Sequence, residues 1–265
     1  MMAVGIALFP RSCFGDAKKD RKKAAGLISG EITRLQVHKV YISDFLDPSG
    51  TRTDRGCFFS SVFSAYLKEQ AKNFEILGRI ETQKFLVRAG IPVANLHNLE
   101  SLAKLSAATG ADAILFGTLV LEKKHAALTL SLREVGNGRE LYQTQYQESL
   151  DSTFEGAFPA ATSPDGQFFY FPDLDGINEP KCIRCPLPGY TPAARKARVT
   201  GTVLFSVIVT EQGKFKDAWL VRSLEPSLEQ AAIEAMRKWS LNPAKDTAGN
   251  PVPVRLVIEV SFSLY

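Results

Sequence analysis

The sequence lacks an apolar run long enough to cross a membrane. No stretch of its 265 residues approaches the roughly 20 consecutive apolar residues that a spanning helix needs. Residues 2–9 are apolar but few, and the polar segment that follows them ends at the small residue Ala17, a pattern typical of the back half of a secretory signal peptide. We therefore expect residues 1–24 to be a truncated signal peptide and basic leader, with an ordinary frayed N-terminus as the alternative.

Residues that commonly serve as metal ligands are also scarce, since the chain has 4 cysteines and 3 histidines. Cys182 and Cys185 form a Cys-x-x-Cys pair, but the other ligands of a structural zinc site are missing from its neighbourhood. Prolines on both sides favour an extended loop over the helix start where a thioredoxin-type pair sits. In an exported protein we expect a local disulfide between Cys182 and Cys185, with redox catalysis as the alternative.

Motifs of the common enzyme classes are absent. The sequence has no Gly-x-Ser-x-Gly, no Walker loop, no His-Glu-x-x-His and no dinucleotide-binding glycine pattern. Its net charge of +4 is spread along the chain, without the basic stripe and interleaved aromatics of a nucleic-acid-binding surface. We therefore expect no catalysis, no cofactor, no metal and no nucleic-acid partner. An envelope hydrolase is the rival enzyme class.

Strand and helix patterns alternate between residues 36 and 150. Strands are expected at 37–45, 74–77 and 113–121, followed by an antiparallel hairpin at 128–147. Apolar residues at helical spacing after Gly56 predict a buried helix face, and Asn98 is placed to cap a later helix. This alternation predicts a mixed α/β sandwich domain over residues 36–150.

Residues 151–188 differ in character from both of their neighbours. Proline, glycine and aspartate are frequent there, and no helical or strand period is visible. Four aromatic residues stand in a row at 168–171, and a free linker would seldom keep such a group exposed. We expect a proline-rich linker that contains the Cys-x-x-Cys pair and packs partly onto a neighbouring domain.

Residues 189–265 carry the sharpest pattern in the chain. Alternating apolar residues predict a hairpin at 199–223, and Ser227 is expected to cap the helix that follows it. Trp239 lies at helical spacing from two alanines and is expected in the core. Residues 252–264 alternate cleanly, so the unit is predicted to have the order β-β-α-β, with one helix on a small sheet.

This last unit resembles the C-terminal domain of the TonB energy-transducer family. The resemblance covers roughly the last seventy-five residues. The features that carry it are Tyr190-Thr191-Pro192-Ala193-Ala194-Arg195, Gly201-Thr202-Val203, Gly213, Ser223, Ala231, Ala232, Ala235, Trp239, Pro243-Ala244, Gly249, Pro251-Val252 and the closing strand to Phe262. The resemblance implies a TonB C-terminal domain at residues 189–265.

The middle domain resembles the N-terminal α/β domain of TolB and the related CsgG and FlgO envelope proteins. The resemblance rests on Val40-Tyr41-Ile42-Ser43-Asp44-Phe45, Phe74-Glu75-Ile76-Leu77-Gly78-Arg79, and the run from Thr109 to Thr118. The expected fold class is thus a combination of α/β and α+β. A mixed α/β sandwich is followed by a small β-β-α-β domain.

The TonB resemblance has implications for function. In that family a membrane helix contacts an ion-driven motor, a proline-rich spacer crosses the periplasm, and the C-terminal domain binds a short segment of an outer-membrane receptor. We therefore expect a periplasmic, cell-envelope protein that binds an envelope protein or peptide, and the family further implies a link to energy-dependent transmembrane transport. A structural adaptor or envelope-assembly protein without energy transduction is the alternative.

Partner binding is expected to work by strand addition, because an edge strand presents unpaired backbone groups to an extended peptide. In the resembled family the closing strand is that edge. The expected partner-binding residues are Arg255, Leu256, Val257, Ile258, Glu259, Val260 and Ser261. Arg255 and Glu259 lie four residues apart on one face, either to read charge on a partner or to keep an exposed edge from aggregating.

Overall fold

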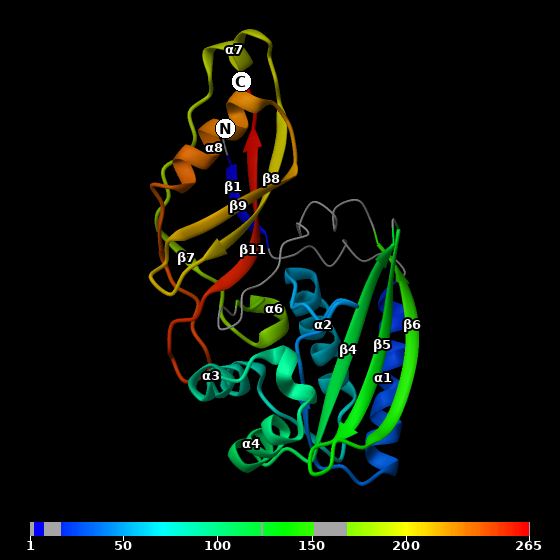
Figure 1. The fold of residues 1–265 in the computed structure, drawn as a ribbon. Helices are drawn as coiled ribbons and strands as arrows, with labels where there is room; N and C mark the ends of the chain where they lie inside the picture. The colour runs from blue at the N-terminus through cyan, green and yellow to red at the C-terminus, as the bar shows by residue number, and fades with distance from the viewer. Residues whose placement is uncertain (1–2, 8–16, 123, 151–168, 265) are drawn as a thin grey trace. The chain divides into compact units, whose positions relative to one another are not determined.

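A computed structural model describes residues 3–7, 17–122, 124–150 and 169–264. These residues form two compact units. We call residues 17–150 the α/β unit, and residues 3–7 together with 169–264 the C-terminal unit. Figure 1 shows both, each with its own sheet and helices.

The α/β unit is built on a five-stranded sheet of order β3-β2-β4-β5-β6. Its strands are β2 (Lys39–Ile42), β3 (Glu75–Ile76), β4 (Ala113–Glu122), β5 (His125–Glu134) and β6 (Glu140–Ser149). Strands β3 and β4 run parallel to β2, whereas β5 and β6 continue the sheet as antiparallel neighbours. The result is the mixed α/β architecture expected for this region.

Local sequence signals set the ends of the helices in this unit. The helices are α1 (Ala17–Arg34), α2 (Asp54–Gln70), α3 (Arg79–Ala89), the 3-10 helix η2 (Val93–His97) and α4 (Leu99–Thr109). The side chain of Asn98 accepts a hydrogen bond from the Glu100 backbone N–H, which confirms its predicted role as the α4 cap. Gly90 and Gly110 end α3 and α4 in the left-handed conformation that glycine adopts readily.

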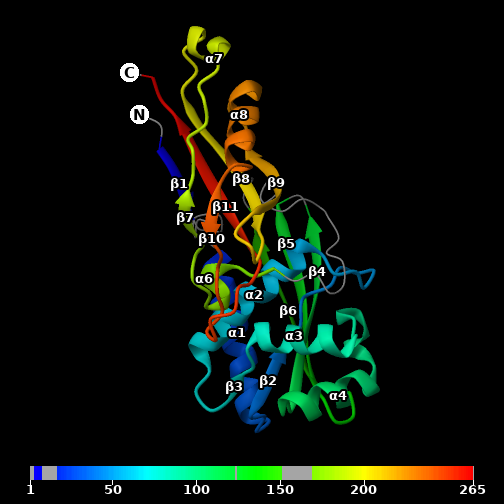
Figure 2. The same ribbon diagram turned by 90° about the vertical axis from the view of Figure 1, so that its left-hand side faces the viewer.

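The helices cover both faces of the sheet (Figure 2). Phe63 of α2 stacks on Tyr146 of β6, and Arg21 of α1 pairs with Glu148 two residues further along the same face. The opposite face carries an apolar core against α3, η2 and α4. The members of that core are Tyr41, Leu46, Leu86, Ile91, Val93, Leu96, Leu102, Leu105, Ala111, Ile114, Phe116 and Val135. The unit is a three-layer α/β sandwich.

Helix α1 differs from the expected leader at residues 1–24. Residues 17–24 form its first two turns, and Arg21 makes two charge-assisted hydrogen bonds of 2.6 Å to the carboxylate of Glu148. Both side chains are buried. The basic run Lys18–Lys23 is therefore part of a packed helix. One residue of this run, Arg21, faces the sheet, and the polar composition of the run gave no indication of this.

The C-terminal unit contains a four-stranded antiparallel sheet of order β1-β11-β8-β9. Its strands are β1 (Ala3–Ala7), β8 (Gly201–Val209), β9 (Phe215–Arg222) and β11 (Val254–Phe262). A second, two-stranded sheet pairs β7 (Lys181–Arg184) with β10 (Ser240–Asn242). The short helices α6 (Pro172–Asp175) and α7 (Pro192–Lys196) precede β8.

Helix α8 (Pro226–Met236) lies across one face of the four-stranded sheet (Figure 2). It buries Leu228, Ala232, Ala235 and Met236. Its cap is Glu225, whose carboxylate accepts from the Leu228 backbone N–H, so the expectation that Ser227 caps the helix is wrong. Proline at the first helical position explains the shift, because Pro226 is preorganised for a helix start and makes Glu225 the cap, two residues before Ser227.

Part of the expected linker at 151–188 belongs to the C-terminal unit. Residues 151–168, Phe168 among them, lie outside the described ranges. Phe169, Tyr170 and Phe171 are buried, and Tyr170 forms an isolated parallel bridge with Val254. The aromatic run thus packs against the first residues of β11.

Candidate functional site

Strand β11, the predicted binding strand, is paired along its full length with β8. The antiparallel register runs from Val254 opposite Val209 to Phe262 opposite Gly201. Alternate side chains face α8, and the backbone N–H and C=O groups that do not point to β8 point to the other side of β11. We call this second side the outer side of β11.

The outer side of β11 is occupied by the chain itself. Tyr170 accepts a hydrogen bond from the Arg255 backbone N–H at 2.9 Å. Further along, β1 pairs antiparallel with Val257–Ser261. The expectation that Arg255–Ser261 forms an edge is therefore not met in this structure, because residues read as a leader supply a fourth strand. Among the described strands, β1 and β9 lie at the ends of the sheet.

Arg255 is fully buried, so it cannot read the charge of a partner from the surface. Its guanidinium carbon lies 4.8 Å from the ring centroid of Phe169 and 4.4 Å from that of Trp219. It also donates a hydrogen bond of 3.2 Å to the hydroxyl of Ser206. Arg255 is a structural cation between two aromatic rings. Sequence spacing could not reveal this, because Phe169 lies 86 positions away in the expected linker.

Glu259 remains the partly accessible charge of the predicted pair. Its side chain accepts a long hydrogen bond of 3.4 Å from the Ser261 hydroxyl. The other predicted binding residues, Leu256, Val257, Ile258 and Val260, are buried. A segment paired to the outer side would therefore contact mainly the backbone of β11, with Glu259 and Ser261 as the side chains able to sense its identity.

The Cys-x-x-Cys pair forms a disulfide, with the Cys182 and Cys185 Cα atoms 6.0 Å apart. Cys182 lies on the exposed strand β7, where an extended loop was expected, and is opposite Leu241 of β10, whereas Cys185 directly follows the strand. Just beyond it, the indole N–H of Trp239 donates to the Pro186 carbonyl at 3.0 Å. Trp239 is buried, as expected, and it anchors the segment that follows the disulfide to the end of α8.

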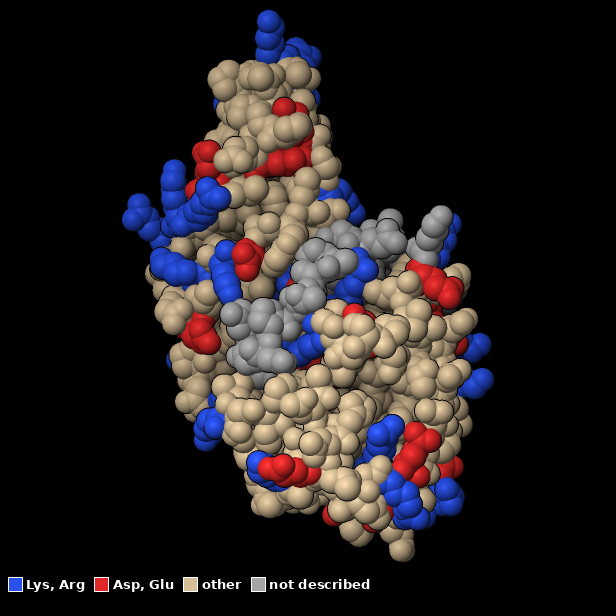
Figure 3. Space-filling model, viewed as in Figure 1, with Lys and Arg blue, Asp and Glu red and all other residues tan. Residues whose placement is uncertain are grey.

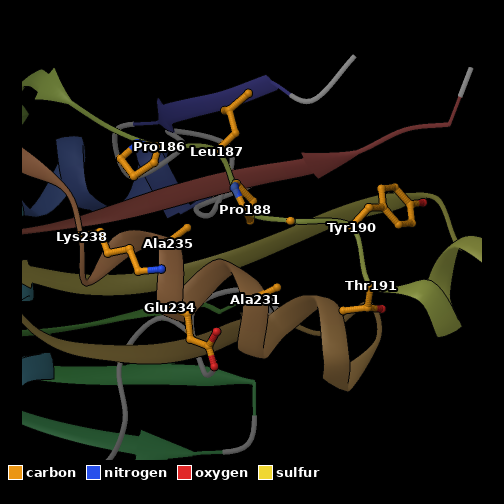
Figure 4. A pocket seen from close by; sticks show the side chains of 10 residues that line it. Pro186, Leu187, Pro188, Tyr190, Thr191, Ala231, Glu234, Ala235 and Lys238 are labelled. Carbon is orange, nitrogen blue, oxygen red and sulfur yellow. The ribbon is translucent and has the colours of Figure 1, made fainter.

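A pocket of about 290 Å³ lies between this anchored segment and α8 (Figure 4). Pro186, Leu187 and Pro188 form one wall, and Glu234 of α8 and Lys238, in the turn after α8, lie on the other. The lining combines polar and apolar surface and includes one acidic and one basic side chain, Glu234 and Lys238. The sequence analysis did not predict this pocket. The sequence feature that could have indicated it is the pair Pro186 and Pro188 after Cys185, which forms part of one wall.

Asp44 is a buried carboxylate at the end of β2 in the α/β unit. It accepts from Arg52 Nε at 2.7 Å and from Arg79 Nη2 at 2.6 Å, and Gln83 adds a third donor. Burial raises the pKa of Asp44, but the charges of Arg79 and Arg52 outweigh it and hold the net pKa well below its usual range. Asp44 is thus the centre of a buried ion cluster with two arginines.

Other chemistry is not visible in the described residues. No group of three or more His, Cys, Asp or Glu side chains gathers there in a way that could hold a metal ion. Within the same residues, no helix is both long and apolar enough to cross a membrane. On the face shown in Figure 3, acidic and basic side chains are interspersed rather than segregated into one patch.

Comparison with known proteins identifies the C-terminal part of the chain. Residues 186–264 match the family model described as Gram-negative bacterial TonB protein C-terminal. The protein TonB of Vibrio cholerae is 35% identical over 90 residues. That match spans 33% of this chain and 36% of the relative, so it covers about a third of each protein.

Parts of the chain are also similar to solved structures. The Pseudomonas aeruginosa TonB C-terminal domain is 22% identical, covers 33% of this chain and 86% of its own, and has a TM-score of 0.29. The LpoB C-terminal domain from Escherichia coli is 11% identical, covers 50% of this chain and 98% of its own, and has a TM-score of 0.38. The family model and the Vibrio relative agree on the same segment, and residues 186–264 of this protein are a TonB-family C-terminal domain.

Proposed function

We propose that this protein works in the cell envelope, in the periplasm, and binds an extended segment of another envelope protein by strand addition to the outer side of β11. One observation carries the proposal: the outer side accepts a five-residue strand in regular antiparallel register at Val257–Ser261. Backbone pairing of this kind gives affinity for an extended peptide without a preformed side-chain pocket. The TonB-family match of residues 186–264 supports a protein-binding role for the same domain.

A link to energy-dependent transmembrane transport is the finer part of the proposal. It is supported by the 35% identity over 90 residues to a protein named TonB. Energy transduction also requires a contact with an energy source, which this domain alone does not supply. An outer-membrane receptor is then the partner to expect. An adaptor without energy transduction is the second candidate, and the separate α/β unit favours it because it offers a second, independent binding module.

Site-specific photocrosslinking in cells tests the binding role. A photoreactive residue in place of Glu259 faces any strand on the outer side of β11. The same residue in place of Glu211, in the β8–β9 turn, is the matched control. We expect an adduct with an envelope protein at position 259 and none at 211. A synthetic peptide of the crosslinked segment should then bind the purified full chain, and equal adducts at both positions would contradict the proposal.

A further inference from the structure

Two segments of the chain share the outer side of β11, and they differ in how firmly they are held. Tyr170 lies at the start of β11, between Phe169, which packs on Arg255, and Phe171, which is buried. Strand β1 covers the remainder, from Val257 to Ser261. The predicted binding stretch is therefore covered by a strand at the very end of the sheet.

Strand β1 is the neighbour of β11 that is easier to remove. It pairs over five positions, Ala3 to Ala7, whereas β8 pairs with β11 over the nine positions from Val254 to Phe262. Its central residue is Gly5, and a glycine inside a strand costs about 0.5–1 kcal/mol relative to alanine. Edge strands with few pairs open at low free-energy cost while the rest of the sheet stays folded.

We propose that β1 is an internal stand-in for the partner strand: it occupies the partner-binding side of β11, and an envelope segment binds by displacing it. The proposal rests on the proposed function, because it concerns the same five positions of β11. It adds a regulatory step, since the binding-competent state is the one in which β1 has left. The apparent affinity for a partner is reduced by the fraction of molecules in which β1 stays in place.

The register also indicates the partner's chemistry. Gly5 lies opposite Glu259, so the internal strand offers no charge at that position. A partner with Lys or Arg there gains an opposite-charge cross-strand pair that β1 cannot make. The fitting partner is thus an extended segment of at least five residues with a basic residue at its centre.

Disulfide trapping tests where β1 lies. In a Cys13→Ser background, Ala3→Cys with Ser261→Cys joins two residues that the register places opposite each other. Ala7→Cys with Ser261→Cys is the matched control, four positions out of register and roughly 13 Å away by strand rise. We expect oxidation to close the first pair and not the second. Equal yields from both pairs would overturn the proposal.

Peptide binding tests the displacement itself. The probe is a fluorescent peptide with the sequence of residues 2–8 of this chain, added to the full-length protein. The Gly5→Pro variant, whose β1 loses a ladder hydrogen bond, should bind it at least tenfold more tightly than wild type. The trapped Ala3→Cys/Ser261→Cys chain should not bind it until reduced, with the reduced single variant Ser261→Cys as control. Equal binding by all forms would overturn the proposal.

A second peptide with Lys at the position of Gly5 tests the partner's chemistry. It should bind the Gly5→Pro chain about two- to fivefold more tightly than the unchanged peptide, and a Glu version should bind more weakly. Crosslinking of an envelope protein at position 259 in both free and trapped chains would overturn the role of β1 and leave the proposed function standing. Peptide binding that follows the release of β1, with no envelope adduct at 259, would support this role and contradict the proposed function.

Discussion

Arg255 shows how much a single side chain contributes to the C-terminal sheet. Its charge is removed from water and lies between the rings of Phe169 and Trp219. The planar guanidinium lies over both rings and also donates a hydrogen bond to Ser206. The compact ammonium group of a lysine cannot make all of these contacts. Arg255 therefore joins the aromatic run before β7 to the last strand of the chain.

Arg255→Lys is expected to destabilise the C-terminal unit by about 1–2 kcal/mol, because the buried stacking is lost while the charge stays. The chain has 2 tryptophans, Trp219 and Trp239, and both are in this unit. Urea unfolding followed by tryptophan fluorescence therefore reports on this unit alone. The matched change Arg222→Lys, at an exposed end of β9, should shift stability by less than about 0.5 kcal/mol. A similar shift for both variants would contradict the stacking role.

Asp44 is the corresponding residue of the α/β unit, where it compensates two buried cations. Asp44→Asn should destabilise that unit by about 3–5 kcal/mol, because the buried guanidinium groups of Arg52 and Arg79 lose the negative charge with which both pair. Far-UV circular dichroism should show the loss while the fluorescence midpoint stays unchanged. Asp47→Asn, in a surface turn, is the control and should cost about 1 kcal/mol.

The pH dependence of this unit follows from the lowered pKa of Asp44. Because the folded pKa lies below the unfolded value of about 3.9, the ionised carboxylate contributes full stability above that value. The contribution is lost as the pH falls toward the folded pKa. Wild type should thus lose stability in acid from about pH 5 downward, and Asp44→Asn should lack this component. An unchanged acid profile in the variant would show that other groups cause it.

Local and long-range features of single residues differed in how well the sequence predicted them. The cap at Asn98 was predictable because the side chain bonds a backbone group two residues away. The burial of Trp239 was predicted from a helical spacing and is confirmed, although α8 ends at Met236 and Trp239 follows the helix. The roles of Asp44, Arg21 and Arg255 were not predictable, because their partners lie 35, 127 and 49 positions away in sequence.

At the scale of elements, the β8–β9 hairpin depends on one glycine. Gly213 has a φ of +69°, and a Cβ atom there would lie 1.9 Å from the carbonyl oxygen of Leu241. The Leu241 backbone N–H also donates to the Gly213 carbonyl at 3.2 Å. The turn is therefore held against β10, and only a residue without a side chain fits this position.

Gly213→Ala is expected to destabilise the C-terminal unit by at least about 2 kcal/mol, since left-handed strain and a backbone clash combine. Tryptophan fluorescence in urea again provides the measurement. Gly189→Ala is the matched control, because no atom lies within 4 Å of its added Cβ and its φ is not positive. It should leave stability within about 0.5 kcal/mol of wild type. Equal effects would show that the turn tolerates a side chain.

The thiols of β7 and α2 should differ sharply in reactivity. Cys182, on the exposed strand β7, is paired with Cys185, so both should react with a maleimide only after mild reduction. Cys57 is buried, and burial raises the pKa of its thiol to about 12, so it should stay unlabelled until the chain unfolds. Peptide mapping by mass spectrometry separates the sites. Labelling of Cys182 without reductant would contradict the disulfide.

The elements most faithfully predicted were those with a sharp period and local caps. The closing strand, the α4 helix and the β5–β6 hairpin appear where the sequence placed them. Strand β1 was not predicted, because a short apolar run near an N-terminus has the composition of a leader. The pairing of β1 depends on the backbone of β11, some 250 positions away. The composition of residues 3–7 carries no information about that pairing.

At the scale of the whole molecule, the strand order determines which strand forms the edge of the C-terminal sheet next to β11. Without β1 on its outer side, β11 would present five backbone positions, with Glu259 as the accessible charge, to any neighbour. Such an edge also fits a second copy of itself, because two antiparallel β11 strands can pair about a twofold axis. The property that admits a partner strand also admits self-association.

Sedimentation velocity should reveal this second outcome. The Gly5→Pro chain is expected to form dimers whose fraction rises with concentration, beyond that of wild type at the same concentration. The trapped Ala3→Cys/Ser261→Cys chain should show no such rise, and identical behaviour of all three would contradict it. The five residues of β1 thus determine which strand forms this end of the sheet: with β1 in place β11 is an interior strand, and without it β11 is an edge that can pair with a strand of a second molecule.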